Sequence, residues 1–507
     1  MLPTLAQVYT RANQGIRAPA VSVEVHLSQG LPALHIVGLP EAAVRESKDR
    51  VRSALINSGF DFPDGRITVN LAPADLPKEG GRFDLPIALG ILVASGQLPG
   101  KVLENKEFLG ELALSGHLRP VRAVLPAALA CKEIDRELIL PEQNASIAAM
   151  VSSITIIGVR SLTEVCAYLQ EKTHIEPAKP SQDDYKTNYP DMSDVRGQEQ
   201  AKRALLVAAA GSHHLLLFGP PGTGKTMLAS RLPGLLPPLT ETEALDVAAV
   251  HSLTSSTTNA LWQRPFRTPH HSSSSVSLVG GGSMPQPGEV SFAHHGVLFL
   301  DEMPEFARTA LEMLREPLEN GEVVITRAKG QECFPAQFQL VGAMNPCPCG
   351  YLGDSQRSCQ CSPDQIRRYR NKLSGPLLDR IDLQIEVPSQ TIQTIMEPAV
   401  QNNDSKEPHS SRLRDLVIKA RKKQLSRQGK INRQLSPKEL FEVCALGEKE
   451  KELITRASGH LQISTRGLHR ILRVSRTIAD LADSTSVLCS HLGEAMQYRQ
   501  LDRQSVK

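Results

Sequence analysis

The sequence predicts an α/β protein with three folded parts. These are a mixed α/β N-terminal block, a second block with a parallel sheet covered on both faces, and a helical C-terminal region. Strand-like and helix-like patterns alternate over the first 170 residues. Continuous apolar runs at 214–219, 296–302 and 337–345 are typical of strands buried on both faces. After about Val387 the strand signals stop, and helix-forming sequence continues to the C-terminus.

Length and charge limit the possible classes. A chain of 507 residues is too long for one ordinary core, so several domains are expected. The net charge is only +3, from 57 Lys and Arg against 54 Asp and Glu, so any affinity for nucleic acid must come from local patches. We expect a cytoplasmic protein without a membrane segment, because the sequence has neither a signal region nor a long apolar run. A reducing compartment disfavours structural disulfides.

The first block spans residues 1–170. Strands have apolar residues at a period of two, and helices have them at a period near 3.6. The strand-like segments are 21–27, 66–72 and 154–159, and the helix-like segments are 41–59 and 83–96.

A linker, 171–192, follows the first block. It contains three prolines and Ile175 as its single branched aliphatic residue, so it cannot bury enough apolar surface to fold alone. The second block then covers 193–388, and the helical region covers 389–507.

The motif GPPGTGKT at 219–226 predicts a nucleotide site. It fits the phosphate-binding pattern G-x-x-x-x-G-K-[ST] and stands between an apolar strand and a helix, as this motif requires. Lys225 is expected to reach the β- and γ-phosphates, and the Thr226 hydroxyl to bind Mg²⁺. A glycine-rich turn that fits by chance is the alternative. The loop residues expected around the phosphates are Gly219, Pro220, Pro221, Gly222, Thr223 and Gly224.

A hydrophobic strand that ends in two acids, GVLFLDE at 296–302, is the expected partner of this loop. Asp301 would hold the Mg²⁺ ion, and Glu302 would polarise the attacking water as general base. Ordinary exposed acids at a strand end are the alternative. Because the pair stands 75 residues beyond a phosphate loop, it predicts a nucleoside-triphosphate hydrolase, and specifically an ATPase.

Two further polar residues extend the predicted site. Asn345 ends the third apolar strand, where its side chain can position water and sense the γ-phosphate; a simple turn residue is the alternative. Arg380, in SGPLLDRIDL, is suited to stabilise charge on a neighbouring subunit's γ-phosphate. A local salt bridge with Asp379 is its alternative.

These motifs resemble the AAA+ ATPases, specifically the magnesium-chelatase-like branch. Residues 266–306 are similar to the helix-2 insert and second acidic motif of that branch, and 317–350 to its pre-sensor hairpin and first sensor. The resemblance implies that Arg380 acts in trans as an arginine finger.

The segment 464–481 resembles the sensor-2 helix of the same branch. This resemblance implies that Arg466 contacts the γ-phosphate in cis, with Arg470 and Arg473 as the alternatives.

The N-terminal block, over 71–92 and 108–130, resembles the Lon-protease-like domain of the ComM/YifB proteins, which has a ribosomal S5 domain 2-like fold. That family is linked to natural transformation and DNA recombination, and is understood as a hexameric helicase that drives branch migration. The resemblance therefore implies a homo-hexamer that binds DNA and works beside other recombination proteins.

Proteolysis of the Lon type is not expected from this block. It needs a serine nucleophile activated by a lysine. The serine's place falls among Arg82, Phe83 and Asp84, and the segment that should carry the lysine, 120–128, has none. We expect a structural or DNA-guiding role instead.

Two basic features could contact DNA in a central pore. Arg327 and Lys329 lie near the tip of the expected hairpin, and 411–433 has nine Lys and Arg against the single acid Asp415. A solvated turn and a solvated helix face are the alternatives. With one Trp in the chain, base stacking cannot dominate. The expected ligand is single-stranded, double-stranded or branched DNA, bound with little regard to sequence.

Three His–His pairs, at 213–214, 270–271 and 294–295, invite a metal hypothesis. Adjacent side chains diverge, so each pair offers at most one ligand. We expect structural or phosphate-facing roles, with an approach of the second pair to DNA or a neighbouring subunit as the alternative.

Four of the nine cysteines, Cys347, Cys349, Cys359 and Cys361, fall within 15 residues. Two C-x-C pairs can supply four thiolates to a tetrahedral ion, and Zn²⁺ fits best because it is redox-silent and takes closed Cys₄ sites. Four buried thiols without metal are the alternative. The cluster would act as a structural clip between Asn345 and Arg380.

The sequence and the resemblance together predict an ATP- and Mg²⁺-dependent hexameric AAA+ helicase that promotes branch migration in homologous recombination and natural transformation. An ATP-driven protein remodeller, similar to a magnesium chelatase motor subunit, is the alternative. A non-enzymatic, ATP-gated assembly scaffold is the third hypothesis. The basic segment 411–433 favours DNA over a protein client.

Overall fold

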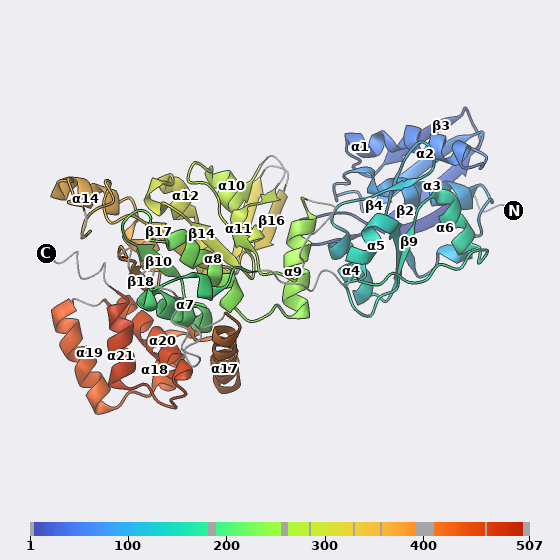
Figure 1. The fold of residues 1–507 in the computed structure, drawn as a ribbon. Helices are drawn as coiled ribbons and strands as arrows, with labels where there is room; N and C mark the ends of the chain where they lie inside the picture. Colours follow the sequence, from blue (N-terminus) through green and yellow to red (C-terminus); the bar gives the residue numbers. More distant parts are fainter. Residues whose placement is uncertain are drawn as a thin grey trace. The chain divides into compact units, whose positions relative to one another are not determined.

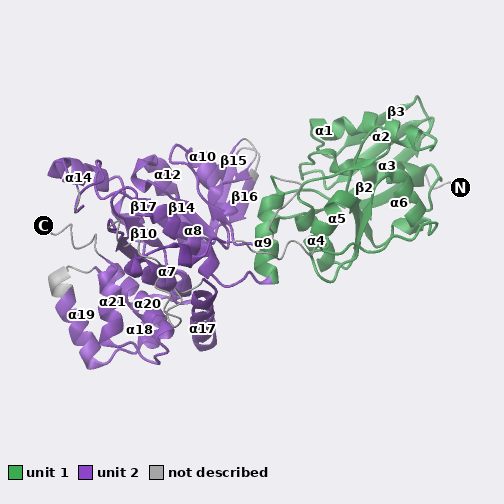
Figure 2. Cartoon of the chain, viewed as in Figure 1, with its two compact units in different colours: residues 1–186, 241–262 green, residues 187–240, 263–507 purple. Residues whose placement is uncertain are grey.

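The structure is a computed structural model of the chain. It divides into two compact units (Figure 2): unit 1 contains 1–186 and 241–262, and unit 2 contains 187–240 and 263–507. The residues described are 5–180, 189–254, 262–282, 285–327, 330–354, 357–390, 410–461 and 464–499. No helix among them has both the length and the apolar composition needed to cross a bilayer.

Unit 1 is a mixed α/β domain on a seven-stranded sheet with the order β3-β4-β2-β1-β5-β8-β9 (Figure 1). The strands of unit 1 are β1 Leu5–Arg11, β2 Ala20–Ser28, β3 Ala33–Val37, β4 Arg66–Ala72, β5 Lys106–Phe108, β6 Glu111–Leu112, β7 Leu118–Arg119, β8 Glu137–Pro141 and β9 Ile156–Val159. Its helices are α1 Ala42–Arg45, α2 Ser47–Asn57, α3 Asp84–Ala94, α4 Val124–Glu133, α5 Glu142–Ala148, α6 Leu162–Leu169 and α9 Glu241–Ser252.

One strand of this sheet, β2, runs opposite to the other six. β2 pairs antiparallel with β1 and β4, whereas β3–β4, β1–β5, β5–β8 and β8–β9 are parallel pairs. Helix α3 packs on β1 and β2, and all its residues are buried, which explains why its sequence has almost no polar face. Gly90 fits there because an added Cβ would lie 2.5 Å from Val25 Cγ2.

Helix α9 belongs to unit 1, although it follows the phosphate-loop helix in the chain. Leu245 and Ala248 are buried in the cluster that also holds Leu125 and Ala128 of α4. The Ala123 N–H also donates to the Ser252 carbonyl at 3.0 Å. The sequence-based division placed these residues in the block 193–388, but their apolar side chains are buried in unit 1.

Unit 2 is built on a five-stranded parallel sheet with the order β11-β14-β17-β10-β18. Its strands are β10 Leu215–Phe218, β11 Phe266–Arg267, β12 Gly280–Gly281, β13 Gln286–Pro287, β14 Val297–Leu300, β15 Glu322–Arg327, β16 Gly330–Pro335, β17 Gln339–Met344 and β18 Leu383–Glu386. Its helices are α7 Glu199–Gly211, α8 Lys225–Leu235, α10 Ser275–Val279, α11 Glu289–Phe292, α12 Arg308–Met313, α13 Arg315–Asn320, α14 Pro363–Arg370, α15 Gly375–Leu378, α17 Ser410–Gln428, α18 Pro437–Cys444, α19 Glu448–Leu461, α20 Thr465–Leu481 and α21 Cys489–Gln497.

The sheet and the C-terminal helices of unit 2 share one hydrophobic core. Leu217 of β10 and Leu228 of α8 belong to the same buried cluster as Leu440, Ile471 and Leu472 of the helical region. The predicted fold class is confirmed: both blocks are α/β, the second has a parallel sheet, and the C-terminal region is helical.

A buried polar network joins the sheet of unit 2 to α20. The His213 ring contacts Asp382 Oδ2 at 3.0 Å through Nδ1 and Thr477 Oγ1 at 2.8 Å through Nε2. Asn432 Nδ2 donates to Thr477 Oγ1 at 3.1 Å and to Asp480 Oδ2 at 2.8 Å. Because buried polar groups are costly without partners, these contacts fix α20 against the amino ends of β10 and β18.

The Asp382 carboxylate is the titratable part of this network. Burial by itself raises the pKa of Asp382, but the hydrogen bond with His213 and the nearby positive charge of Arg433 outweigh burial and hold it below its ordinary value. A lowered pKa in the folded state stabilises the fold above the ordinary pKa, about 4, and that contribution is lost as the pH falls.

We expect Asp382→Asn to lower the free energy of unfolding by about 3 kcal/mol near neutral pH, because it breaks a buried pair. The difference from wild type should narrow below about pH 4, where Asp382 of the unfolded wild-type chain begins to bind protons while the folded carboxylate stays ionised. Urea unfolding at the two pH values measures both effects. Glu452→Gln is the control, since its pair with Arg456 is exposed on both sides and should change the free energy by no more than about 1 kcal/mol. Equal losses of unfolding free energy in Asp382→Asn and Glu452→Gln would contradict a stabilising role for the buried Asp382 carboxylate.

Candidate active site

The phosphate loop connects the buried strand β10 to helix α8. Gly222 and Gly224 have φ of 76° and 87°, in the left-handed region that favours glycine, and an added Cβ at either would meet no atom within 4 Å. Helix α8 begins at Lys225, directly after Gly224. The loop therefore presents its backbone at a helix N-terminus, which is suited to bind phosphate.

Lys225 lies inside this loop. Its ammonium group donates to the carbonyl oxygens of Gly219 at 2.7 Å and Pro220 at 2.8 Å, and to Asn345 Oδ1 at 3.3 Å. Burial lowers the pKa of Lys225, while the charges of Asp301 and Glu302 oppose that shift. A cation held among acceptors in this way can exchange carbonyl partners for phosphate oxygens.

The two acids after β14 take different positions. Asp301 Oδ2 accepts a hydrogen bond from Thr226 Oγ1 at 2.7 Å, so these two oxygen donors lie together as a Mg²⁺ site requires. Glu302 is exposed. Its φ of 49° and ψ of 44° lie in the left-handed region, so the chain departs from the extended strand conformation at this residue.

The parallel register explains why these residues meet. Phe218 of β10 pairs with Met344 of β17, and Leu300 of β14 pairs with Gly342. The carboxyl ends of the three strands therefore lie at one edge of the sheet, where the phosphate loop, Asp301 and Asn345 begin. Backbone amides, an ammonium group, a hydroxyl and two carboxylates at one edge can hold a Mg²⁺–nucleotide and activate water for phosphoryl transfer.

His271, of the second His–His pair, lies beside Glu302, a contact that the sequence did not predict. Its Nδ1 lies 3.5 Å from Glu302 Oε2. The strand register accounts for the contact. Arg267 of β11 pairs with Leu298 of β14, 31 residues further along the chain. The same offset, continued past the ends of the two strands, brings His271 opposite Glu302. The offset depends on pairing between two strands, so no local motif reveals it.

The other His–His pairs are structural, as expected. His214 is buried, and its Nδ1 accepts a hydrogen bond from the Leu340 N–H at 2.9 Å. Burial lowers the pKa of His214 well below its ordinary value, which keeps the ring neutral. His294 Nδ1 accepts from the Gln337 N–H at 3.0 Å.

Arg380 lies at the opposite edge of the sheet from the phosphate loop. It follows α15 and stands two residues before Asp382, which contacts His213 at the amino end of β10. Four residues of parallel strand, about 13 Å at the usual rise, separate the two ends of β10. Arg380 therefore lies on a different side of unit 2 from Lys225, as an arginine that serves another subunit would.

The partners of Arg380 differ from Asp379, with which the alternative interpretation expected a local salt bridge. Its guanidinium pairs with Glu319 and donates to the Pro376 carbonyl at 2.6 Å. Asp379 instead pairs with Arg470 at 2.8 Å. Arg380 also lines a cavity of about 460 Å³, together with Arg327 of the hairpin.

Arg466 lies on the side of Arg380. It is exposed, and its Nη1 is 3.9 Å from Asp379 Oδ2. Its helix, α20, is anchored through Thr477 to His213, at the amino end of β10. The resemblance implied a cis contact with the γ-phosphate, but among the described residues Arg466 has its contact at the other edge of the sheet.

The expected hairpin before the sensor strand is present as β15–β16, with Glu322 paired to Pro335 at its base and Arg327 to Gly330 at its tip. Arg327 is exposed, and its Nη1 donates to the Thr326 carbonyl at 2.8 Å. Lys329 lies outside the described residues. The hairpin therefore places one described cation at its tip.

The basic segment 411–433 forms α17 and the turn after it, and most of its cations have partners within the chain. These pairs include Arg414 with the Gly234 carbonyl, Arg421 with the Ala209 carbonyl, Arg427 with Asp480, Lys430 with Glu439 and Arg433 with the Leu318 carbonyl. Lys423 pairs with Asp483. Arg412, Lys419 and Lys422 are exposed, and have no such partner within the described part of the chain. The structural alternative therefore accounts for most of the segment.

Arg82 is one of the three residues of unit 1 among which the place of the Lon-type serine falls. The side chain is buried and donates from Nη2 to the carbonyl oxygens of Arg122 and Ala123, the segment that lacks the lysine. Burial lowers the pKa of Arg82 to about 10. Asp84, nearby, is bound by Arg50 at 2.7 Å. A guanidinium is not a nucleophile, so these contacts are consistent with the absence of Lon-type protease chemistry, which stays a prediction.

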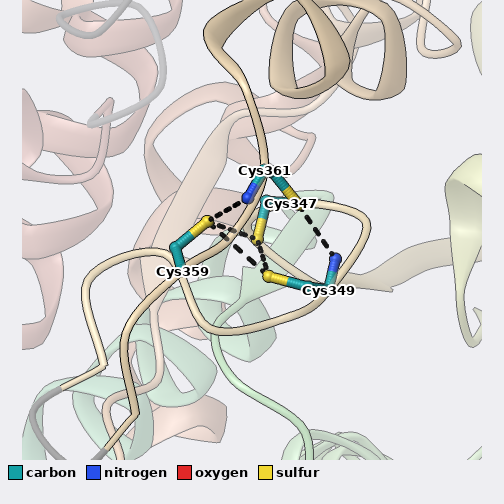
Figure 3. Close-up of side chains that lie close together, drawn as sticks. All are labelled: Cys347, Cys349, Cys359 and Cys361. Atoms are coloured by element: carbon teal, nitrogen blue, oxygen red, sulfur yellow. Dashed lines mark hydrogen bonds between the residues drawn. The ribbon is translucent and has the colours of Figure 1, made fainter.

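The four cysteines converge between β17 and α14 (Figure 3). Their sulfur atoms all lie within 4.8 Å of one another. All four are free thiols, and Cys347 is fully buried. The donor set fits a soft, tetrahedral ion.

We expect Glu302→Gln to lower kcat for ATP hydrolysis by about 10²- to 10⁴-fold with little change in ATP affinity, because it removes the general base and leaves the phosphate loop intact. His271→Ala should lower kcat about tenfold, with KM unchanged, through the orientation of Glu302.

Steady-state hydrolysis and nucleotide binding measure both effects. His270→Ala is the matched control: its ring stacks on His271 at 4.1 Å, but its Nδ1 contacts Ser272 Oγ. His271→Gln should recover part of the rate. Identical kcat values for His271→Ala and wild type would show that the contact has no catalytic role.

Comparisons with known proteins agree with this geometry. Family models described as "Magnesium chelatase, subunit ChlI", "Subunit ChlI of Mg-chelatase" and "Magnesium chelatase, subunit ChlI C-terminal" match residues 191–395, 23–144 and 407–499. Lon protease 2 of Bacillus subtilis is 29% identical over 31% of this chain and 32% of its own length.

Several relatives match over nearly their full length. Competence protein ComM of Haemophilus influenzae is 52% identical over 99% of this chain and 98% of its own. The uncharacterized protein YifB of Escherichia coli is 47% identical over 99% of this chain and 98% of its own. The chain therefore belongs to the ComM/YifB family of magnesium-chelatase-like AAA+ proteins.

Proposed function

We propose that the protein is an ATP-driven, hexameric DNA translocase that promotes branch migration in homologous recombination during natural transformation. The observation that carries the motor part is the division of the site between two edges of one sheet. Lys225, Thr226 and Asp301 lie at one edge and Arg380 at the other. A ring in which each subunit's Arg380 serves its neighbour completes every site, so hydrolysis is coupled to assembly.

The geometry supports a trans role for Arg466 as well. Arg466 and Arg470 both lie near Asp379, the residue before Arg380. The three arginines would then approach the same nucleotide of the neighbouring subunit, where they would stabilise charge that develops in the transition state.

Support for DNA as the substrate is separate. The relative with 52% identity is a competence protein, and the hairpin β15–β16 carries the exposed Arg327 beside Arg380 in one cavity. A cation on a projection that borders the arginine finger could move along a phosphate backbone as nucleotide is hydrolysed. Contacts of this kind are independent of sequence.

The proposed cofactors follow from the donor sets. ATP would bind the phosphate loop, Mg²⁺ would bind Thr226 and Asp301, and a structural Zn²⁺ would bind the four-cysteine cluster. A cytoplasmic location is part of the proposal, since four clustered thiols persist best in a reducing compartment.

Branch migration of a four-way DNA junction tests the proposal directly. We expect wild-type protein with ATP and Mg²⁺ to convert the junction into its duplex products by branch migration. Lys225→Ala should have less than a hundredth of that rate, because the ammonium that contacts phosphate is missing. Lys451→Ala is the control, since its exposed pair with Glu448 lies on α19. If wild type fails while a protein partner, and not DNA, stimulates its ATPase, the protein is the remodeller of the alternative hypothesis. ATP-dependent assembly without hydrolysis would favour the scaffold.

Mixing variants tests the trans role of Arg380. Lys225→Ala and Arg380→Ala should each be inactive in hydrolysis. A mixed population should recover activity at about a quarter of its interfaces, where an intact loop meets an intact arginine. Arg456→Ala, an exposed lid arginine, should retain full activity. Recovery in the mixture supports action between subunits, whereas a mixture as inactive as its parts would mean that Arg380 acts within its own chain.

A further inference from the structure

The four-cysteine cluster lies directly between the γ-phosphate sensor and the next helix. Cys347 stands two residues after Asn345, and Cys361 stands directly before Ser362, the N-cap of α14. Ser362 Oγ accepts from the Gln365 N–H, and Gln365 Oε1 accepts from the Ser362 N–H, so the start of α14 is rigidly capped.

The sulfur positions match a closed metal site better than disulfides. The Sγ–Sγ separations are 3.3 Å for Cys347–Cys349 and 3.6 Å for both Cys347–Cys359 and Cys349–Cys359. A disulfide needs about 2.05 Å. With Zn–S bonds near 2.3 Å, the edge of a tetrahedron of four sulfurs is about 3.8 Å.

Backbone amides orient the thiols toward a common centre (Figure 3). The Cys349 N–H donates to Cys361 Sγ at 3.4 Å, and the Cys361 N–H donates to Cys359 Sγ at 3.4 Å. Hydrogen bonds of this kind stabilise thiolates and hold metal ligands in place.

The loop that the cysteines close packs against the phosphate loop. Gly350 has φ 85°, and an added Cβ would lie 2.9 Å from Pro221 Cδ and 3.9 Å from Asn345 Cγ. A side chain larger than hydrogen at position 350 would therefore push the cysteine loop away from both the phosphate loop and the sensor.

Helix α14 returns to the same sensor from the other side of the cluster. The phenol of Tyr369 lies close to the backbone N–H of Asn345, which opposes the rise that burial causes in the pKa of Tyr369. Arg370 Nε donates to the Pro346 carbonyl at 3.3 Å. The chain thus leaves Asn345, passes through all four cysteines and comes back to Asn345, so the cluster closes a loop with the sensor at its base.

We propose that Zn²⁺ held by Cys347, Cys349, Cys359 and Cys361 fastens Asn345 against Lys225 and Pro221, so that metal occupancy sets the rate of ATP hydrolysis. The inference rests on the proposed ATPase function. Asn345 Oδ1 is 3.3 Å from Lys225 Nζ, and a loosened loop would let that distance vary. A displacement of the water-positioning group by about 1 Å can cost on the order of 10²-fold in rate. Loss of this positioning should therefore lower kcat. ATP affinity should stay the same, because it depends on the phosphate loop itself.

The first test measures metal content in the purified full-length chain. We expect about one zinc per chain in wild type and in Cys489→Ser, whose thiol contacts Glu450 in the lid, and much less than one in Cys359→Ser and Cys361→Ser. Titration with a thiol reagent should detect the remaining three cysteines of the cluster in those two variants, because no metal protects them. A zinc-free wild type, or one that carries iron, would overturn the assignment of the ion.

The second test separates position from folding. Cys361→Ser should lower kcat at least tenfold with ATP affinity within about threefold of wild type, and Cys361→His, which can still ligate zinc, should recover both metal and rate. Chelator treatment of wild type should lower kcat, and added Zn²⁺ should restore it, which separates metal loss from misfolding. Zinc loss with unchanged kcat would overturn the positioning role. Metal content and ATP affinity are measured without DNA, so failure of the DNA-motor proposal would leave both readouts intact.

Discussion

The parallel pairing of β10 with β17 and β18 is the constraint on which the active site depends. It brings the phosphate loop and Asn345 to the carboxyl edge, and it sends Asp382 and the arginines before it to the amino edge. The strands are short and, apart from the exposed Glu386 at the end of β18, buried, so their register is fixed by packing on both faces and cannot slip without exposing apolar side chains. In the proposed mechanism, one subunit therefore carries the two halves of a catalytic site at different edges of its sheet, and a second subunit is needed to bring them together.

Buried charge supports that division. The His213–Asp382–Thr477 contacts anchor the lid helix at the amino edge, where the hydrophobic core alone would not specify its rotation. In unit 1, Arg82 is held in a similar way, because its buried guanidinium donates to backbone carbonyls. Each buried cation has acceptors that offset its desolvation, so these groups specify geometry more than they add stability.

The sequence predicted what is local in the chain. Lys225, Thr226, Asp301 and Asn345 follow buried strands, and their motifs carry enough context to place them at one edge. His271 was missed as a partner of Glu302 because the contact depends on an offset between two strands, of which β11 has only two residues. The cis role of Arg466 and the DNA role of 411–433 stay predictions, because both depend on tertiary packing that the sequence does not show. The first depends on which edge α20 contacts, and the second on backbone carbonyls and acids that take up most of the cations. The cysteine cluster was visible from spacing, whereas its contact with Pro221 was not.

Helix α9 has a consequence for attempts to dissect the protein. The chain leaves unit 2 after α8, contributes α9 to the core of unit 1 and returns at β11, so the covalent path crosses between the units three times. A fragment that begins at residue 193 would keep α9 and lose α4, which would expose Leu245 and Ala248 to solvent. Such a fragment would be prone to aggregate for reasons unrelated to its ATPase core. The complementary fragment that ends at residue 170 would lack part of its own interior. The two units are compact, but they are not independent modules in the linear sequence.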